Sequence, residues 1–104
     1  MNLGQLIQRL RQEPSDKIVP LGFYSANSYR GYYEDLAFAP ARNVTVGEML
    51  RAAEEANGET YHGWKGGDYV MDLDSTVWLA EQGHCGETLG PVLLDYMLGK
   101  YNSP

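Results

Sequence analysis

The sequence predicts an α+β fold, with three helices packed on a mainly antiparallel sheet. Three segments, near the start, the middle and the end of the chain, have the apolar spacing and the terminal residues of helices. The short strand-like runs between them do not alternate with helices as a doubly wound parallel sheet requires. The chain has 104 residues, of which 43% are hydrophobic and 21% charged, so we expect one domain over residues 1–104.

An amphipathic helix is expected first, over residues 3–12. Asn2 has the side chain of an N-cap residue, and Pro14 is expected to stop the helix. Four apolar residues lie at helical spacing within it: Leu3, Leu6, Ile7 and Leu10.

Two short strands separated by a loop are expected next. The first, residues 18–23, contains Pro20, which has no N–H to pair, so we expect either an edge strand or an extended segment that leads into the sheet. Polar turn formers over residues 24–33 predict a loop. A second strand is expected over about residues 34–39 and ends at Pro40.

The middle helix has both a start signal and an end signal. Thr45 and Glu48 fit the capping box, in which the hydroxyl and the carboxylate each accept a hydrogen bond from an otherwise unpaired backbone N–H. The pair Asn57-Gly58 suits the left-handed backbone that follows many helices. The apolar stripe between these signals comprises Val46, Met49, Leu50 and Ala53.

A β-hairpin is predicted after this helix. The runs 60–64 and 68–71 are rich in strand formers and flank the turn Lys65-Gly66-Gly67. Residues 76–80 then predict a further strand, because Thr, Val and Trp favour pleated, half-buried positions.

A loop and a last helix complete the chain. Residues 81–88 contain two glycines and are expected to be a loop. The helix is expected from about Pro91 to Leu98, since proline is tolerated in the first turn and Gly99 stands near the end.

Six of the twelve aromatic residues lie between Phe23 and Phe38, and four of them are tyrosines. Tyrosine offers a flat face and a hydroxyl, and an arginine can bind a phosphate or a carboxylate in a bidentate manner. The alternative is that these tyrosines are half buried in strands and that the arginine pairs with a nearby carboxylate. The candidate ligand-binding residues here are Asn27, Ser28, Tyr29, Arg30, Tyr32 and Tyr33.

A second aromatic cluster lies at the predicted hairpin turn. Trp64 and Lys65 at its tip are positioned to close over a ligand, since loops that carry large aromatic residues are often binding sites. The alternative is a structural turn with Trp64 folded back onto the core.

The charge and the cysteine content limit the classes of partner. A formal net charge of −6 argues against direct binding to nucleic acid, which needs clustered cations. Residues 1–33 nevertheless carry four cations and two anions, which allows a basic pole at the amino-terminal end. The single cysteine, the absence of a leader and the lack of a long apolar span lead us to expect a cytoplasmic protein without a membrane partner.

No constellation for catalysis or metal binding stands out. His62, His84 and Cys85 do not have the number or spacing of ligands that metal sites need. Asp72 and Asp74 lack the glycine and glutamate of a calcium loop and are more simply turn residues. We therefore expect no catalytic residue, no metal and no cofactor. The alternative is a small hydrolase or transferase that acts on a nucleotide.

Three segments resemble small uncharacterised proteins encoded by bacteriophages. They are Asn27-Ser-Tyr-Arg-Gly-Tyr-Tyr-Glu-Asp-Leu-Ala-Phe-Ala-Pro40, Thr45-Val-Gly-Glu-Met-Leu50 and Tyr61-His-Gly-Trp-Lys-Gly-Gly-Asp-Tyr-Val-Met71. The resemblance implies expression in an infected bacterial cytoplasm. By analogy, small phage proteins often interfere with host defences, either by occupying a defence protein or by sequestering a nucleotide signal.

Two functional hypotheses follow. The first is a non-catalytic, homo-oligomeric protein that sequesters a small anionic, nucleotide-like ligand between residues 28–35 and the Trp64-Lys65 turn. The second is an acidic inhibitor that occupies the nucleic-acid site of a host protein, with Asp72, Asp74, Glu81 and Glu87 as the carboxylates that matter.

Overall fold

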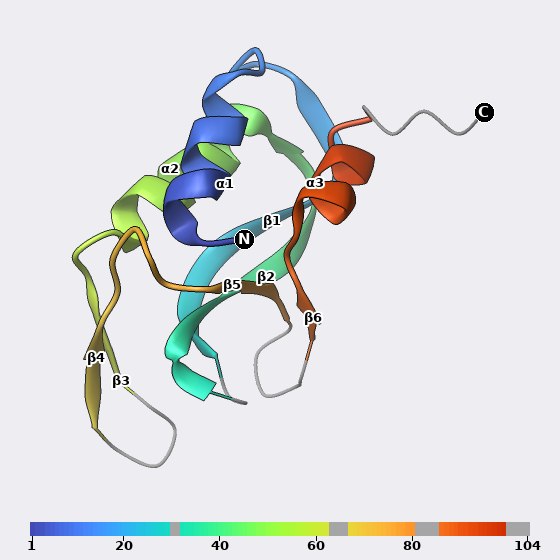
Figure 1. The fold of residues 1–104 in the computed structure, drawn as a ribbon. Helices are drawn as coiled ribbons and strands as arrows, with labels where there is room; N and C mark the ends of the chain where they lie inside the picture. The colour runs from blue at the N-terminus through green and yellow to red at the C-terminus, as the bar shows by residue number, and fades with distance from the viewer. Residues whose placement is uncertain (30–31, 63–66, 81–85, 100–104) are drawn as a thin grey trace.

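The computed structural model describes residues 1–29, 32–62, 67–80 and 86–99, with backbone alone for Ser28, residues 32–34 and His62. Within these residues it contains three helices and six strands (Figure 1). In chain order they are α1 (Leu3–Arg11), β1 (Ile18–Tyr29), β2 (Tyr32–Thr45), α2 (Val46–Ala56), β3 (Thr60–His62), β4 (Asp68–Val70), β5 (Val77–Leu79), β6 (Glu87–Thr88) and α3 (Pro91–Met97).

The strands form two sheets. The larger has the order β1-β2-β5-β6, in which β1 and β2 are antiparallel, β2 and β5 are parallel, and β5 and β6 are antiparallel. The smaller is the antiparallel hairpin β3–β4. The predicted α+β class, with three helices and a mainly antiparallel sheet, is confirmed.

The core lies between the long β1–β2 hairpin and the helices. Phe23 of β1 and Phe38 of β2 are fully buried, with ring centroids 4.6 Å apart. Helices α1 and α2 pack against each other, and α2 packs on β1 (Figure 1). The apolar face predicted for α1 is buried as expected: Leu3, Leu6, Ile7 and Leu10.

Both predicted helix starts are confirmed in detail. The Asn2 side chain accepts a hydrogen bond from the backbone N–H of Gln5, whose own side chain accepts one from the N–H of Asn2. Thr45 and Glu48 form the same reciprocal pair at the start of α2, each bond 3.1 Å long. Each cap satisfies two backbone donors that the helix itself leaves unpaired.

The first hairpin is longer than predicted. The prediction of a loop over residues 24–33 is wrong for most of these residues. Strand β1 continues to Tyr29, because residues 24–29 find partners in β2. Ser25 has a φ of 45° where the register shifts, which marks a bulge that absorbs a turn-forming residue within the strand. Tertiary pairing here overrides the local preference of Ser and Asn for turns.

Pro40 does not end the second strand, which was also predicted too short. Strand β2 continues to Thr45, with Pro40 opposite Phe23. Within the described residues, β2 pairs with β5 only from Leu36 to Phe38, so Pro40 lies beyond this pairing, where a residue without an N–H is tolerated. The prediction of a loop over residues 81–88 is also wrong at its end, because Glu87 and Thr88 pair with β5.

The chain start holds the turn before β5 in place. Asn2 forms an isolated antiparallel bridge with Thr76. The N–H of Leu3 donates to the carbonyl of Ser75, and the N–H of Gly4 donates to that of Leu73, both at 2.9 Å. The first helical turn thus fixes the segment that carries Asp72 and Asp74.

None of the helices in the described part of the chain has the length and apolar character needed to cross a bilayer.

The capping box at Thr45 gives a test of this local structure. We expect Thr45→Ala to lower the free energy of unfolding by about 1 kcal/mol, because the N–H of Glu48 loses its acceptor. Thr45→Ser, which keeps a hydroxyl, should cost less than half as much. Urea denaturation followed by circular dichroism measures both, and equal losses would contradict a capping role.

Candidate functional site

The structure places part of the predicted ligand-binding segment at the end of the β1–β2 hairpin. Asn27 is exposed on β1, opposite Ala37. The backbone of Ser28 pairs with that of Leu36, and Tyr29 lies opposite Tyr32. Tyr33 follows in β2. The other three predicted site residues lie outside the described residues: Arg30, Trp64 and Lys65.

The two hairpins that carry the predicted site residues lie beside each other. Strand β1 contacts β3, and β2 contacts β4. In Figure 1 the Tyr29 end of β1 and the His62 end of β3 both point to the lower end of the molecule. The described strands of the two hairpins are therefore neighbours, while Arg30, Trp64 and Lys65 lie outside the described residues.

Tyr29 packs against a residue that the sequence does not connect with it. Its ring stacks on Trp78 of β5, with centroids 4.2 Å apart and an interplanar angle of 6°. The indole Nε1–H of Trp78 donates to Asp35 Oδ2 at 2.9 Å. Tyr29 is 5% exposed, so one face of this predicted ligand-stacking residue is covered by Trp78.

Four aspartates gather around a depression between β2 and β4. Its volume is about 380 Å³, and the turn before β5 closes one side. The four, which we call the acidic face, come from separate parts of the chain: Asp35 of β2, Asp68 of β4, and Asp72 and Asp74 of the turn. Sequence reasoning missed Asp35 and Asp68 as members. The pairing of β2 with β5 brings Asp35 to the turn, whereas Asp68 lies on β4, which leads into the turn.

Hydrogen bonds fix two of these aspartates. Asp35 accepts the bond from Trp78. The Oδ1 atom of Asp72 accepts a hydrogen bond of 2.9 Å from the backbone N–H of Asp74, as in an Asx turn. The orientations of these two carboxylates are therefore fixed by contacts within the molecule.

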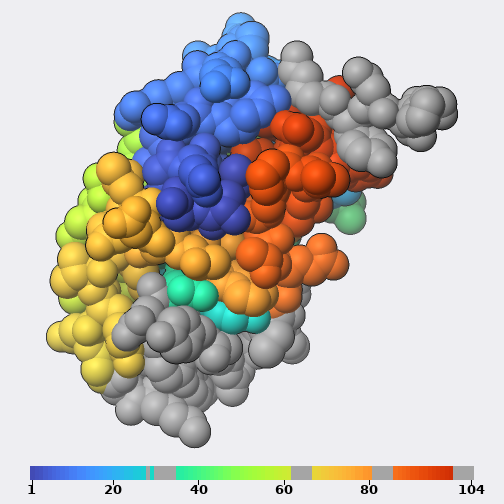
Figure 2. All heavy atoms as spheres, viewed as in Figure 1, coloured from blue at the N-terminus to red at the C-terminus, as the bar shows by residue number. Residues whose placement is uncertain are grey.

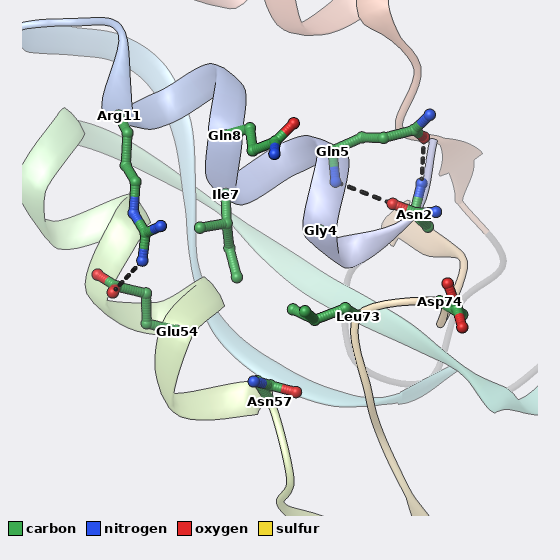
Figure 3. A pocket seen from close by; sticks show the side chains of 10 residues that line it. All are labelled: Asn2, Gly4, Gln5, Ile7, Gln8, Arg11, Glu54, Asn57, Leu73 and Asp74. Atoms are coloured by element: carbon green, nitrogen blue, oxygen red, sulfur yellow. Dashed lines mark hydrogen bonds and ion pairs between the residues drawn. The ribbon is translucent and has the colours of Figure 1, made fainter.

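A second depression adjoins the acidic face at Asp74. It lies between α1, α2 and the turn before β5, with a volume of about 460 Å³ (Figure 3). Figure 3 shows Leu73 on its floor with Asp74 and Asn57 at its edge, and the ion pair between Arg11 and Glu54 at the opposite end. Leu73 is 48% exposed, so an accessible apolar side chain lies next to the carboxylates of the acidic face.

Ion pairs neutralise the cations near the amino-terminal helix. The pairs within the described residues are Arg9–Glu13, Arg9–Asp95, Arg11–Glu54 and Lys17–Glu13, with N···O distances of 3.0–3.3 Å. The basic pole expected at this end is thus compensated by carboxylates. Among the described cations, none forms an ion pair with Asp35, Asp72 or Asp74.

The environment of β3 is also unfavourable to further negative charge. Burial raises the pKa of the Tyr61 hydroxyl above its ordinary value, and the Glu59 and Glu55 carboxylates raise that pKa further. Tyr61 therefore stays neutral and able to donate a hydrogen bond at physiological pH.

The described residues contain no cluster of three or more His, Cys, Asp or Glu side chains arranged to hold a metal ion. His84 and Cys85 lie outside the described residues, and for His62 only the backbone is described. The four aspartates of the acidic face line an open depression.

Comparison with models of protein families, with curated proteins and with solved structures found no match.

The stack between Tyr29 and Trp78 predicts a difference between two substitutions. We expect Tyr29→Ala to lower the free energy of unfolding by about 3 kcal/mol, because a buried ring is lost and Trp78 is left unpacked. Tyr29→Phe keeps the stacked ring and should cost about 1 kcal/mol or less. Urea unfolding curves provide the measurement, and a Tyr29→Ala protein as stable as the parent would show that the stack carries no stability.

Proposed function

We infer that this chain is a non-catalytic binding protein whose acidic face occupies the basic, nucleic-acid-binding surface of a protein partner. The observation that carries the proposal is the gathering of Asp35, Asp68, Asp72 and Asp74 around one depression. The resemblance to phage-encoded proteins makes a factor of the infected bacterial cell, such as a defence protein, the partner that we propose.

The charge distribution supports a cationic partner. Like charges on neighbouring aspartates repel one another, and a partner's Lys or Arg side chains relieve that repulsion on binding. Within the described residues the cations of α1 are already paired, so they do not compensate the acidic face from within the molecule.

The apolar residues beside the carboxylates support a protein as the partner. Val70 and Leu73 are 66% and 48% exposed. Each belongs to one of the two depressions that adjoin at Asp74. Protein interfaces combine apolar contacts at their centre with polar and charged groups around them, and they draw much of their affinity from the former.

Neutralising the turn aspartates tests the proposal. We expect the double variant Asp72→Asn, Asp74→Asn to lose its capture of basic proteins from a bacterial lysate, measured by affinity purification and quantitative mass spectrometry. Asparagine at position 72 keeps the acceptor for the N–H of Asp74, so the turn is preserved. Affinity for an oligo-arginine peptide should fall about thirtyfold, since two charge-assisted contacts of roughly 1 kcal/mol each are lost.

A control variant removes the same charge elsewhere. Asp16 lies in the segment between α1 and β1. Glu87, which the sequence-based hypothesis counted among the carboxylates that matter, lies on β6 and does not line the depression of the acidic face. The double variant Asp16→Asn, Glu87→Gln should keep both the captured proteins and the peptide affinity. Equal losses in the two double variants would mean that net charge alone drives binding, and the acidic face would have no special role.

Sequestration of a small anionic, nucleotide-like ligand is the second candidate. Its support is the position of the β1–β2 hairpin beside the β3–β4 hairpin, which together carry all the predicted ligand-binding residues. The acidic face repels an anion that approaches the β1–β2 and β3–β4 hairpins. Binding of a nucleotide-like ligand there therefore requires the cations Arg30 and Lys65.

Native mass spectrometry separates the two candidates. For a nucleotide-binding protein we expect a stoichiometric, unmodified nucleotide to be released on denaturation of protein purified from bacterial cells or mixed with a nucleotide panel. Arg30→Ala should abolish that retention, while the Asp72→Asn, Asp74→Asn variant should keep it. A ligand-free protein across the whole panel would exclude this candidate.

A further inference from the structure

The depression that adjoins the acidic face at Asp74 has walls that the fold holds in a fixed arrangement. Figure 2 shows the start of α1 against the turn before β5 at the surface of the molecule. The N–H groups of Leu3 and Gly4 donate hydrogen bonds of 2.9 Å to carbonyl groups of this turn. The turn and α1 therefore keep their relative position, and the depression, with a volume of about 460 Å³, is formed before any partner binds.

The lining of this depression combines an accessible apolar side chain with polar groups (Figure 3). Leu73 lies on the floor, while Asp74 and Asn57 stand at the edge. Within the described residues, no cation forms an ion pair with the carboxylate of Asp74. A side chain with an apolar stem and a cationic end that carries several hydrogen-bond donors is complementary to these three residues.

An ion pair within the chain occupies the opposite end of the depression. Arg11 Nη2 lies 3.0 Å from Glu54 Oε2 (Figure 3). The Glu54 carboxylate is therefore already neutralised by an arginine of this chain. Among the described residues that line the depression, Asp74 is the carboxylate that is left for a cation from outside.

We propose that this depression receives an arginine side chain from the basic surface of the partner, and we call it the arginine pocket. This inference rests on the proposed function, because the arginine belongs to the same cationic partner. The methylene stem of the arginine lies on Leu73, since long cationic side chains cover apolar surface in this way. Its planar guanidinium donates two hydrogen bonds to the Asp74 carboxylate and a further one to the side-chain oxygen of Asn57.

Other occupants suit this lining less well. The ammonium group of lysine is a compact, strongly hydrated charge that binds as a point, whereas a guanidinium presents five N–H donors in one plane. An anion is repelled by Asp74, and a purely apolar group would bury its carboxylate without a partner. The arginine pocket therefore gives the acidic face a preference for arginine over lysine, which net charge alone does not provide.

Isothermal titration calorimetry of the full chain with hexa-arginine and with hexa-lysine, at one ionic strength, tests the proposal. We expect the parent to bind hexa-arginine about tenfold more tightly, as one additional charge-assisted hydrogen bond would provide. Leu73→Ser and Asn57→Ala should each lower this ratio to about threefold or less, mainly by weakening the binding of hexa-arginine. Both side chains are exposed, so both variants should keep the parent's circular dichroism spectrum and melting temperature.

Matched controls carry the same substitutions outside the arginine pocket. Leu21 and Asn27 are exposed on β1 and do not line the pocket, so Leu21→Ser and Asn27→Ala should keep the parent's ratio. Equal affinity of the parent for the two peptides would overturn the arginine pocket and leave the proposed function intact, as would a ratio that falls no further in the pocket variants than in the controls. A parent that binds neither peptide would overturn the proposed function and this inference with it.

Discussion

The pairing of β1 with β2 is the constraint on which the other elements depend. Helix α2 starts at Val46, directly after β2 ends at Thr45, so the hairpin sets where α2 lies. The same strand pairs with β5 and brings Phe38 onto Phe23 in the core. A shift of one residue in this register would turn the buried face of β2 outward and remove both contacts.

The helices were predictable because their signals are local. Capping residues and apolar spacing lie within one segment, and no distant partner is needed to recognise the start of α2 at Thr45. The length of the first hairpin was not predictable in this way, since residues 24–29 have turn-forming composition and become a strand only through pairing with β2. Strand β6, with two residues, gives no sequence pattern of its own.

The candidate site shows the same division between local and distant information. Asp72 and Asp74 were recognisable as turn residues, and the turn does form. Their grouping with Asp35 requires the parallel pairing of Leu36 with Val77, which links segments that are far apart in the sequence. The stacking partner of Tyr29 was hidden for the same reason, because Trp78 reaches it only through the sheet.

Within the described residues the ion pairs are unevenly placed. Carboxylates near α1 are matched by Arg9, Arg11 and Lys17, whereas Asp35, Asp72 and Asp74 form no ion pair with a described cation. A positively charged surface therefore exerts a torque that turns the acidic face toward it during diffusional approach. Association through that face would be fast at low ionic strength and would slow as salt shortens the Debye length, while the dissociation rate would depend mainly on the short-range contacts.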